Sequence, residues 1–397
     1  MRILVLDGNQ NQAVACVRSL ARQDHTVLGG EAASWSNAGL SRFSSATFRY
    51  ESPQHDPAQA LAHILSHSQP GTLILPMTEA TTLLLSSNRD RVLSSGARLV
   101  LPEHSDLLRA VDKNETTRLA ESLKIAVPRT FAVSSLDELR TCARTVRFPV
   151  VLKPRSSESV SAQGKIRATG RPRYAREVAQ LEKAYSDMAE TTNSGLVQEF
   201  VDGAGTGYFA VMSHGELRAE FAHRRIRDVH PTGSGSALRE SILPDPKIRD
   251  ASLSMLKALN WHGVAMVEYR LRDDGVPVFL EINGRFWHSL PLACYAGCDF
   301  PALLAQIAEF GDVKTPPAYR VGVRCRWLVG DFRHFVEVMK GSPTGYPGKF
   351  PGRLQTTVAE LTPVPGTFHD NFMWQDPLPE FGDWIRLLHQ VIWREPR

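Results

Sequence analysis

The sequence has few cysteines and no long apolar run. Only five cysteines occur among the 397 residues, and no two of them form a CxxC motif. Cys294 and Cys298 stand at helical spacing, but two cysteines alone cannot complete a zinc site. We therefore expect reduced thiols, most of them in the core, and a cytoplasmic protein. No apolar stretch approaches the roughly 18–20 residues that span a bilayer, and the apolar core of residues 1–7 is too short for a signal peptide.

An excess of charge of one sign is also lacking. The 46 lysines and arginines face 42 aspartates and glutamates, which gives a formal net charge of +4, and the two signs are interspersed. This balance predicts neither a nucleic-acid partner nor a membrane partner. Hydrophobic residues make up 42% and charged residues 22% of the chain, as in ordinary globular proteins, so a wholly disordered chain is excluded.

Apolar strands alternate with helical segments over residues 1–104. We expect strands at Ile3–Leu6, Val27–Leu28, Thr72–Pro76 and Arg98–Leu101. This order predicts a parallel sheet with helices on its faces, and ligands of such sheets bind at the carboxyl ends of the strands, here near residues 7–11 and 76–79. The first loop contains Gly8 but lacks the GxGxxG pattern of dinucleotide-binding proteins. It is either a plain strand-to-helix turn or a helix N-terminus that receives an anion.

Two carboxylates and an amide converge in a predicted hairpin. Glu268 lies on the strand 263–271 and Glu281 on the strand 276–282, joined by an Asp-Asp-Gly turn. Glu281 and Asn283 share one face of their strand, and hard oxygen donors of this kind suit Mg²⁺, which takes its other ligands from water and phosphates. Arg285 adds a cation suited to a phosphate or an acyl-phosphate. A surface ion-pair network is the alternative, but the apolar run before Glu281 favours the metal site.

A single lysine ends another predicted strand. Lys153 follows Val150-Val151-Leu152, and its ammonium could hold a phosphate as a point charge. The polar loop 155–165 comes next, and its serine hydroxyls and backbone N–H groups could close over phosphates. A helix over 175–189 and a strand over 196–201 follow this loop.

Taken in order, these motifs resemble the ATP-grasp superfamily of carboxylate–amine ligases. The resemblance covers about residues 1–310, and its motifs are Asp112-Lys113 before a helix and Val127-Pro128, Pro149–Pro154, Gln198–Val201, Glu268, and Glu281–Arg285. It implies an α/β pre-ATP-grasp domain with a parallel sheet over residues 1–104. An α+β ATP-grasp domain would span 105–310, with a lid subdomain over about 129–200. Residues 311–397 would form a C-terminal extension of unknown role.

The resemblance also implies roles for individual residues. Contacts to ATP are expected from Lys113, Lys153, Ser156, Ser157, Gln198, Glu199, Phe200, Val201 and Asp202, the last as a ribose contact. Glu268, Glu281 and Asn283 would bind Mg²⁺, for which Mn²⁺ could substitute, and Arg225 and Arg285 would be catalytic. Residues 231–241 would form a flexible active-site loop.

The implied activity is the ATP-dependent joining of a small-molecule carboxylate to an amine, through an acyl-phosphate and with release of ADP and phosphate. Arg224, Arg225 and Arg285 favour an amino acid or a small peptide as one substrate. Two alternatives are a bicarbonate-activating, carboxylase-like enzyme and a non-catalytic nucleotide-binding regulator. The final segment places Trp384, Leu387, Leu388, Val391 and Ile392 on one helical face, which is expected to pack against the body of the protein. A homodimer is compatible with the sequence.

Overall fold

The computed structural model describes residues 1–156, 158–160, 166–170, 172–313, 318–362 and 364–392. Its N-terminal part is a sheet of four parallel strands in the order β3-β2-β1-β4, which confirms the predicted parallel sheet. The strands are β1 (Arg2–Val5), β2 (Thr26–Glu31), β3 (Ala46–Arg49) and β4 (Leu73–Leu75), with helices α1 (Asn11–Ala21), α2 (Pro57–Ser66), α3 (Glu79–Ser87) and α4 (Arg89–Ser94). The expected strand at 98–101 is wrong, because only Arg98 forms a single bridge, to Leu73. Strand β3 was not predicted from the sequence.

The first loop of this sheet is held by carboxylates of the chain itself. Asp7 accepts hydrogen bonds from the amides of Met77 and Thr78 at 3.0 and 2.9 Å. The Asn9 amide, just before α1, donates to Glu31 Oε2 at 2.8 Å. A carboxylate of the protein thus already lies at the start of α1, where an anion is favoured. The loop is a strand-to-helix turn that ties β1 to its two neighbours.

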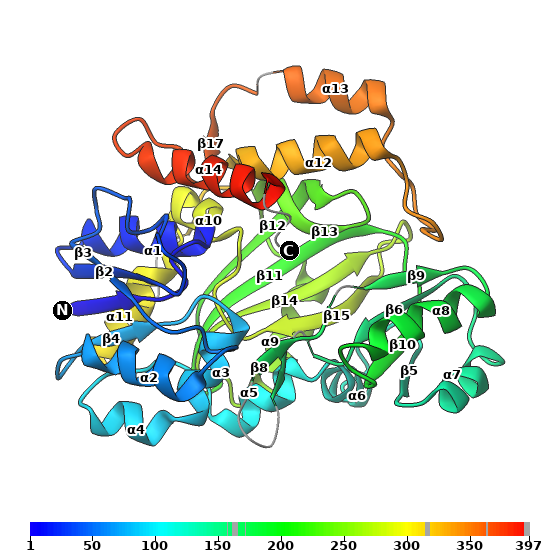
Figure 1. Cartoon of the computed structure of the whole chain (residues 1–397), viewed down its shortest axis with the longest axis horizontal. Helices are drawn as coiled ribbons and strands as arrows, with labels where there is room; N and C mark the ends of the chain where they lie inside the picture. Colours follow the sequence, from blue (N-terminus) through cyan, green and yellow to red (C-terminus); the bar gives the residue numbers. More distant parts are fainter. Residues whose placement is uncertain (157, 161–165, 171, 314–317, 363, 393–397) are drawn as a thin grey trace.

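A second sheet forms one side of the molecule (Figure 1). Its antiparallel order is β5-β10-β6-β9. The strands are β5 (Thr130–Val133), β10 (Gly195–Glu199), β6 (Val150–Pro154) and β9 (Arg173–Ala175), and helices α7 (Leu136–Ala143) and α8 (Val178–Ala189) pack on it through a common apolar core. The helix expected at 175–189 therefore begins three residues later, because Ala175 pairs with β6. Within the polar loop, β7 (Glu158–Val160) and β8 (Ile166–Ala168) pair in antiparallel orientation.

The central sheet has seven strands in the order β15-β14-β11-β12-β13-β16-β17. They are β11 (Ala204–Ser213), β12 (Glu216–His230), β13 (Ser234–Ile242), β14 (Gly263–Leu271), β15 (Pro277–Asn283), β16 (Arg324–Arg326) and β17 (Thr367–His369). Helices α5 (His104–Val111), α6 (Lys113–Ser122), α9 (Pro246–Ala258), α10 (Leu290–Ala296) and α11 (Phe300–Phe310) pack around it. The prediction of a flexible loop at 231–241 is wrong from residue 234 onward, because these residues form β13, which pairs with β12 on one side and β16 on the other.

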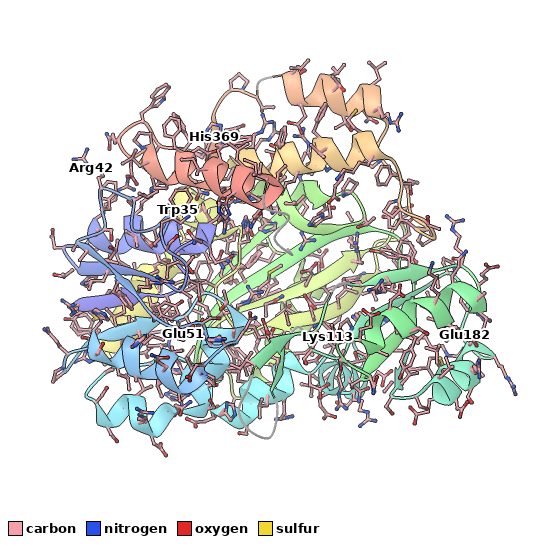
Figure 2. The ribbon with its side chains drawn as sticks, viewed as in Figure 1. Trp35, Arg42, Glu51, Lys113, Glu182 and His369 are labelled. Carbon is pink, nitrogen blue, oxygen red and sulfur yellow. The ribbon has the colours of Figure 1, made fainter. Side chains whose placement is uncertain are left out.

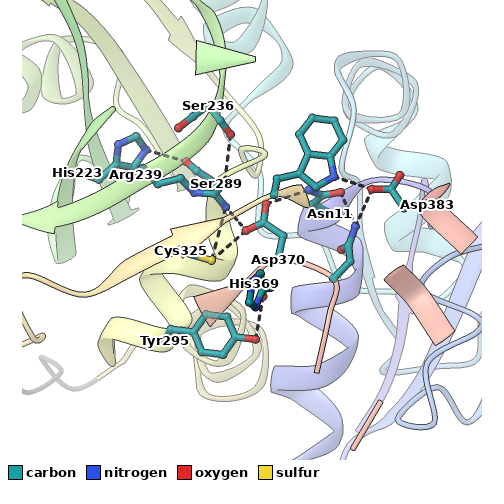
Figure 3. A network of polar contacts seen from close by, with 12 residues as sticks. Asn11, His223, Ser236, Arg239, Ser289, Tyr295, Cys325, His369, Asp370 and Asp383 are labelled. Atoms are coloured by element: carbon teal, nitrogen blue, oxygen red, sulfur yellow. Dashed lines mark hydrogen bonds and ion pairs between the residues drawn. The ribbon is translucent and has the colours of Figure 1, made fainter. Parts of the chain in front are cut away.

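The C-terminal extension is tied to the rest of the chain by buried ion pairs, although Leu388, Val391 and Ile392, which were expected to pack against the body, are exposed. It contributes β16, β17, α12 (Leu328–Lys340), α13 (Arg353–Leu361) and α14 (Leu378–Ile392). Figure 3 shows how it joins the other parts: Asp370, after β17, forms a fully buried ion pair with Arg239 on β13 and accepts a hydrogen bond from Asn11 on α1 at 2.9 Å. A second buried pair joins Arg18 on α1 to Asp376 at 2.8 Å. The extension therefore connects the N-terminal sheet to the central sheet.

All five cysteines are free thiols, and four of them are buried, as expected. Among the helices of the described residues, no single one is long and apolar enough to cross a membrane, although α10 and α11, bent by 86°, meet that test as a pair.

Candidate functional site

A cavity of about 320 Å³ lies between the second sheet and the central sheet. Its polar lining consists of Lys113, Lys153, Ser156, Gln198, Glu199, Glu268, Arg270 and Glu281, and its apolar lining includes Val151, Tyr174, Phe200, Val201 and Leu280. Residues from β6, β10, α6, β14 and β15 thus meet at one place. Figure 2 labels Lys113, where the second sheet approaches the central one. We call this cavity the central pocket.

The two lysines of the central pocket come from different elements. Lys113 begins α6, whose N-cap Asp112 accepts hydrogen bonds from the amides of Asn114 and Glu115 at 2.9 and 3.3 Å. The cap fixes the direction of the first turn and therefore the start of the Lys113 side chain. Lys153 lies on β6 and is buried, and this burial lowers the pKa of its ammonium to about 8, although Glu281 opposes the shift.

The two glutamates face each other across neighbouring antiparallel strands. Glu268 on β14 is in register with Glu281 on β15. Arg225 on β12 donates to Glu268 at 2.8 Å, and Lys113 Nζ lies 3.4 Å from Glu281 Oε2. Burial and the charge of Glu281 raise the pKa of Glu268, despite Arg225. For Glu281 the burial is outweighed by Lys113 and Lys153, which hold its pKa down, at about 2.

Asn283 and Arg285 continue from Glu281 along the chain. Asn283 Nδ2 lies 3.4 Å from Glu281 Oε1, and Arg285 Nη2 lies 3.4 Å from Asn283 Oδ1. These contacts are too long to be strong hydrogen bonds, so the oxygens of Glu281 and Asn283 remain available as ligands. Within the described ranges, no three His, Cys, Asp or Glu side chains are grouped to hold a metal by themselves. Two carboxylates and one amide fit Mg²⁺ that completes its shell with water and phosphate oxygens.

The other candidate residues lie at the edges of the central pocket or outside it. Arg225 is buried behind Glu268 and also lies 3.6 Å from Asp228. Asp202 lines a neighbouring cavity of about 530 Å³ on the far side of the 198–201 segment. Arg224 pairs with Glu240 at 2.5 Å. Ser157 lies outside the described residues.

Several residues that line the central pocket were not predicted from the sequence. Arg270 lies two residues after Glu268 on the same face of β14, and it donates to the carbonyl oxygens of Gly203 and Gly233 at 2.9 and 3.1 Å. The strand periodicity that placed Glu281 beside Asn283 could have identified Arg270 as well. Tyr174 reaches the pocket from β9, and no local motif marks it.

A pair of glutamates links the N-terminal sheet to the polar loop. The amide of Glu158 on β7 donates to Glu79 Oε1, at the start of α3, at 3.1 Å. Burial, together with the charge of Glu79, raises the pKa of Glu158 to about 7, and Arg285 counteracts this shift. Burial also raises the pKa of Glu79, against the charges of Lys113 and Arg285. The sequence placed residues 76–79 at the ligand-binding edge of the first sheet, and Glu79 lies near the cations of the site.

Comparisons with known proteins agree with this arrangement. Residues 193–330 match the family "ATP-grasp in the biosynthetic pathway with Ter operon". The large chain of carbamoyl phosphate synthase from Thermus thermophilus is 27% identical over 263 residues, which are 64% of this chain and 24% of that protein. The chain thus spans about a quarter of the length of this relative.

Solved structures share the fold. Biotin carboxylase from Campylobacter jejuni aligns with a TM-score of 0.63 at 13% identity, over 81% of this chain and 74% of that one. The L-amino acid ligase from Bacillus licheniformis aligns with a TM-score of 0.58 at 14% identity, over 77% and 73%. Residues 193–330 thus match an ATP-grasp family, and the chain shares the fold of these solved structures.

Proposed function

We propose that this protein is an ATP- and Mg²⁺-dependent ligase that activates a carboxylate as an acyl-phosphate and joins it to an amine. The observation that carries the proposal is the convergence of Lys113, Lys153, Glu268 and Glu281 on one cavity beside the 198–201 segment. Residues 1–104 would form the pre-ATP-grasp domain and 105–310 the ATP-grasp domain. The second sheet, within about 129–200, would be the lid.

The adenine would lie against the 198–201 segment, with Val151 and Leu280 lining the same pocket. The amides of Glu199 and Phe200 already donate to the carbonyl oxygens of Arg129 and Pro149 at 2.9 and 3.0 Å. The segment would therefore present the Glu199 carbonyl and the Val201 backbone to the base. Asp202 follows directly and would reach the ribose only around the turn of this segment.

The phosphates would lie between Lys113, Lys153 and the Ser156 hydroxyl. Glu268, Glu281 and Asn283 would hold Mg²⁺, or Mn²⁺ in its place. The bound ion supplies positive charge that offsets the charge developing on the transferred phosphoryl group. The chain itself fixes the donors before the reaction, because both glutamates are on paired strands and Glu268 is held by Arg225.

In the reaction, an oxygen of the substrate carboxylate attacks the γ-phosphorus, and the bond to the β–γ bridging oxygen breaks, which gives the acyl-phosphate and ADP. Arg285 would hold the acceptor carboxylate or the acyl-phosphate, and Arg225 would act through Glu268. The amine then attacks the acyl carbon and expels phosphate, losing a proton to form the amide. Glu79 and Glu158, near Arg285, would receive the ammonium of an amino acid or a small peptide.

A trapping assay tests this proposal even while the amine substrate is unidentified. The protein is incubated with Mg-ATP and hydroxylamine, either with a pool of amino acids and short peptides or with bicarbonate. Acyl-hydroxamates, ADP and ATP binding are measured. An acyl-phosphate intermediate predicts hydroxamate that depends on the pool and is lost in Glu281→Gln. No hydroxamate from amino acids or short peptides would contradict the proposed substrate class. ADP formation that depends on bicarbonate alone would support the carboxylase-like alternative, and ATP binding without any ADP would support a regulator.

A further inference from the structure

The C-terminal extension reaches the adenine side of the central pocket. Tyr346 follows α12 by six residues and is buried, with 9% of its surface exposed. Its ring meets Tyr174 edge-on, with centroids 5.0 Å apart and planes at 81°. It also meets Phe200 edge-on at 6.0 Å and 88°, and Tyr174 and Phe200 meet in the same manner at 6.2 Å. Tyr174 and Phe200 both line the central pocket, so Tyr346 lies directly behind two of its walls.

The segment 341–350, which we call the strap, is fixed by backbone contacts as well as rings. Arg176 Nη2, next to β9, donates to the Tyr346 carbonyl at 2.7 Å. Gly345 has a positive φ of 79°, and a Cβ atom there would lie 2.9 Å from the Tyr174 carbonyl oxygen. A Cβ atom on Gly348 would lie 2.6 Å from the Tyr346 hydroxyl oxygen. The close approach of the strap to β9 therefore depends on glycine at position 345, and Gly348 leaves room for the Tyr346 ring.

The strap borders a second cavity next to the central pocket. A cavity of about 780 Å³ lies between α8 and α12, with Lys183 and Asp187 on one side and Glu337 and Lys340 on the other. Strap residues line one end of this cavity, and Tyr174 lines both this cavity and the central pocket. A displacement of the strap would therefore remove a ring contact from both Tyr174 and Phe200, while the Tyr174 hydroxyl still donates to the Thr232 carbonyl at 3.2 Å.

We propose that Tyr346 is a positioning residue for the nucleotide. This inference rests on the proposed function, since it takes the central pocket to be the ATP site. Tyr346 holds the Tyr174 and Phe200 rings in the orientation that receives the adenine, and it couples the proposed lid to the C-terminal extension. Edge-to-face ring pairs are stabilising beyond the area they bury, and Tyr346 makes two of them with pocket residues.

The test compares a ligand with a base to a ligand without one. The dissociation constants of Mg-ATP and Mg-tripolyphosphate are measured for the wild type, Tyr346→Ala and Tyr346→Phe. We expect Tyr346→Ala to weaken ATP binding by about tenfold, because the Tyr174 and Phe200 rings lose the orientation in which they contact the base, and to leave tripolyphosphate binding within about twofold. Tyr346→Phe keeps the ring and should restore the wild-type value. Val358→Ala, at an exposed position of α13 in the same extension, is the matched control.

Three other outcomes would overturn the inference, and the measurements distinguish them. Unchanged ATP affinity in Tyr346→Ala would show that the strap does not act on the adenine wall. An equal loss of ATP and tripolyphosphate binding, with a lower melting temperature, would show a purely structural role. If the wild type binds neither ligand, the proposed function fails, and this inference fails with it.

Discussion

Glu268 and Glu281 face each other across β14 and β15, and each has its own cation. Arg225 lies 2.8 Å from Glu268, and Lys113 lies 3.4 Å from Glu281. The environments of the two carboxylates differ: Arg225, from β12, is buried and is not among the residues that line the central pocket, whereas Lys113 lines this pocket together with Glu281. Their pKa values move apart accordingly, upward for Glu268 and down to about 2 for Glu281.

Glu281→Gln should raise the Mg²⁺ concentration needed for ATP binding. The amide keeps an oxygen but loses the charge, and loss even of an outer-shell partner of a metal ligand typically costs about 10–100-fold in metal affinity. We expect at least a tenfold rise in the Mg²⁺ concentration at half-saturation, measured by calorimetric titration of ATP at several Mg²⁺ concentrations. Glu182→Gln, which removes only a surface partner of Arg140, is the control and should leave the value unchanged. The same Mg²⁺ dependence in Glu281→Gln and wild type would exclude Glu281 as a ligand.

ATP affinity should fall as the pH rises through about 8. Burial lowers the pKa of Lys153 to about 8, so its ammonium is charged below this pH and neutral above it. A phosphate is held by the charged form, and the affinity should therefore decrease between pH 7 and 9. Lys153→Arg, which stays charged over this range, should bind with little pH dependence. Binding to the wild type that strengthens from pH 7 to 9 would contradict a phosphate contact by Lys153.

Removing the buried partner of Arg239 should destabilise the protein strongly. Asp370 and Arg239 are both fully buried, so Asp370→Ala leaves a buried guanidinium without its counter-ion. Breaking a buried pair in this way costs about 3–5 kcal/mol of unfolding free energy. Asp187→Ala removes an exposed pair with Arg173 and should cost about 0.2–1 kcal/mol. Denaturant unfolding monitored by tryptophan fluorescence measures both, and equal losses would show that the C-terminal extension is not part of the core.

The sequence alone predicts those parts of the site and fold whose motifs are formed by neighbouring residues. Lys153 at the end of an apolar strand and Glu281 with Asn283 at alternate strand positions could be identified from a few neighbouring residues. Lys153 and Glu281 both line the central pocket, and Asn283 lies 3.4 Å from Glu281. The parallel sheet was also predictable, because apolar strands and helices alternate with the right periods.

The features that could not be predicted from the sequence depend on contacts between segments far apart in the chain. Residues 234–241 contain three serines and one glycine and were expected to be a loop. They form β13 instead, which pairs with β12 on one side and, on the other, with β16 from the C-terminal extension. Tyr174 and Tyr346 meet across more than 170 positions, and no local pattern predicts such a contact. Arg239 was unremarkable in the sequence because its partner, Asp370, lies in the extension.

ADP release tests the central claim most directly. The protein is given Mg-ATP with and without pooled amino acids, beside Glu281→Gln and the Glu182→Gln control. A carboxylate–amine ligase predicts ADP release that requires the pool, is retained in Glu182→Gln and disappears in Glu281→Gln. ADP release that is the same with and without the pool, or that persists in Glu281→Gln, would contradict a ligase whose metal is held by Glu281.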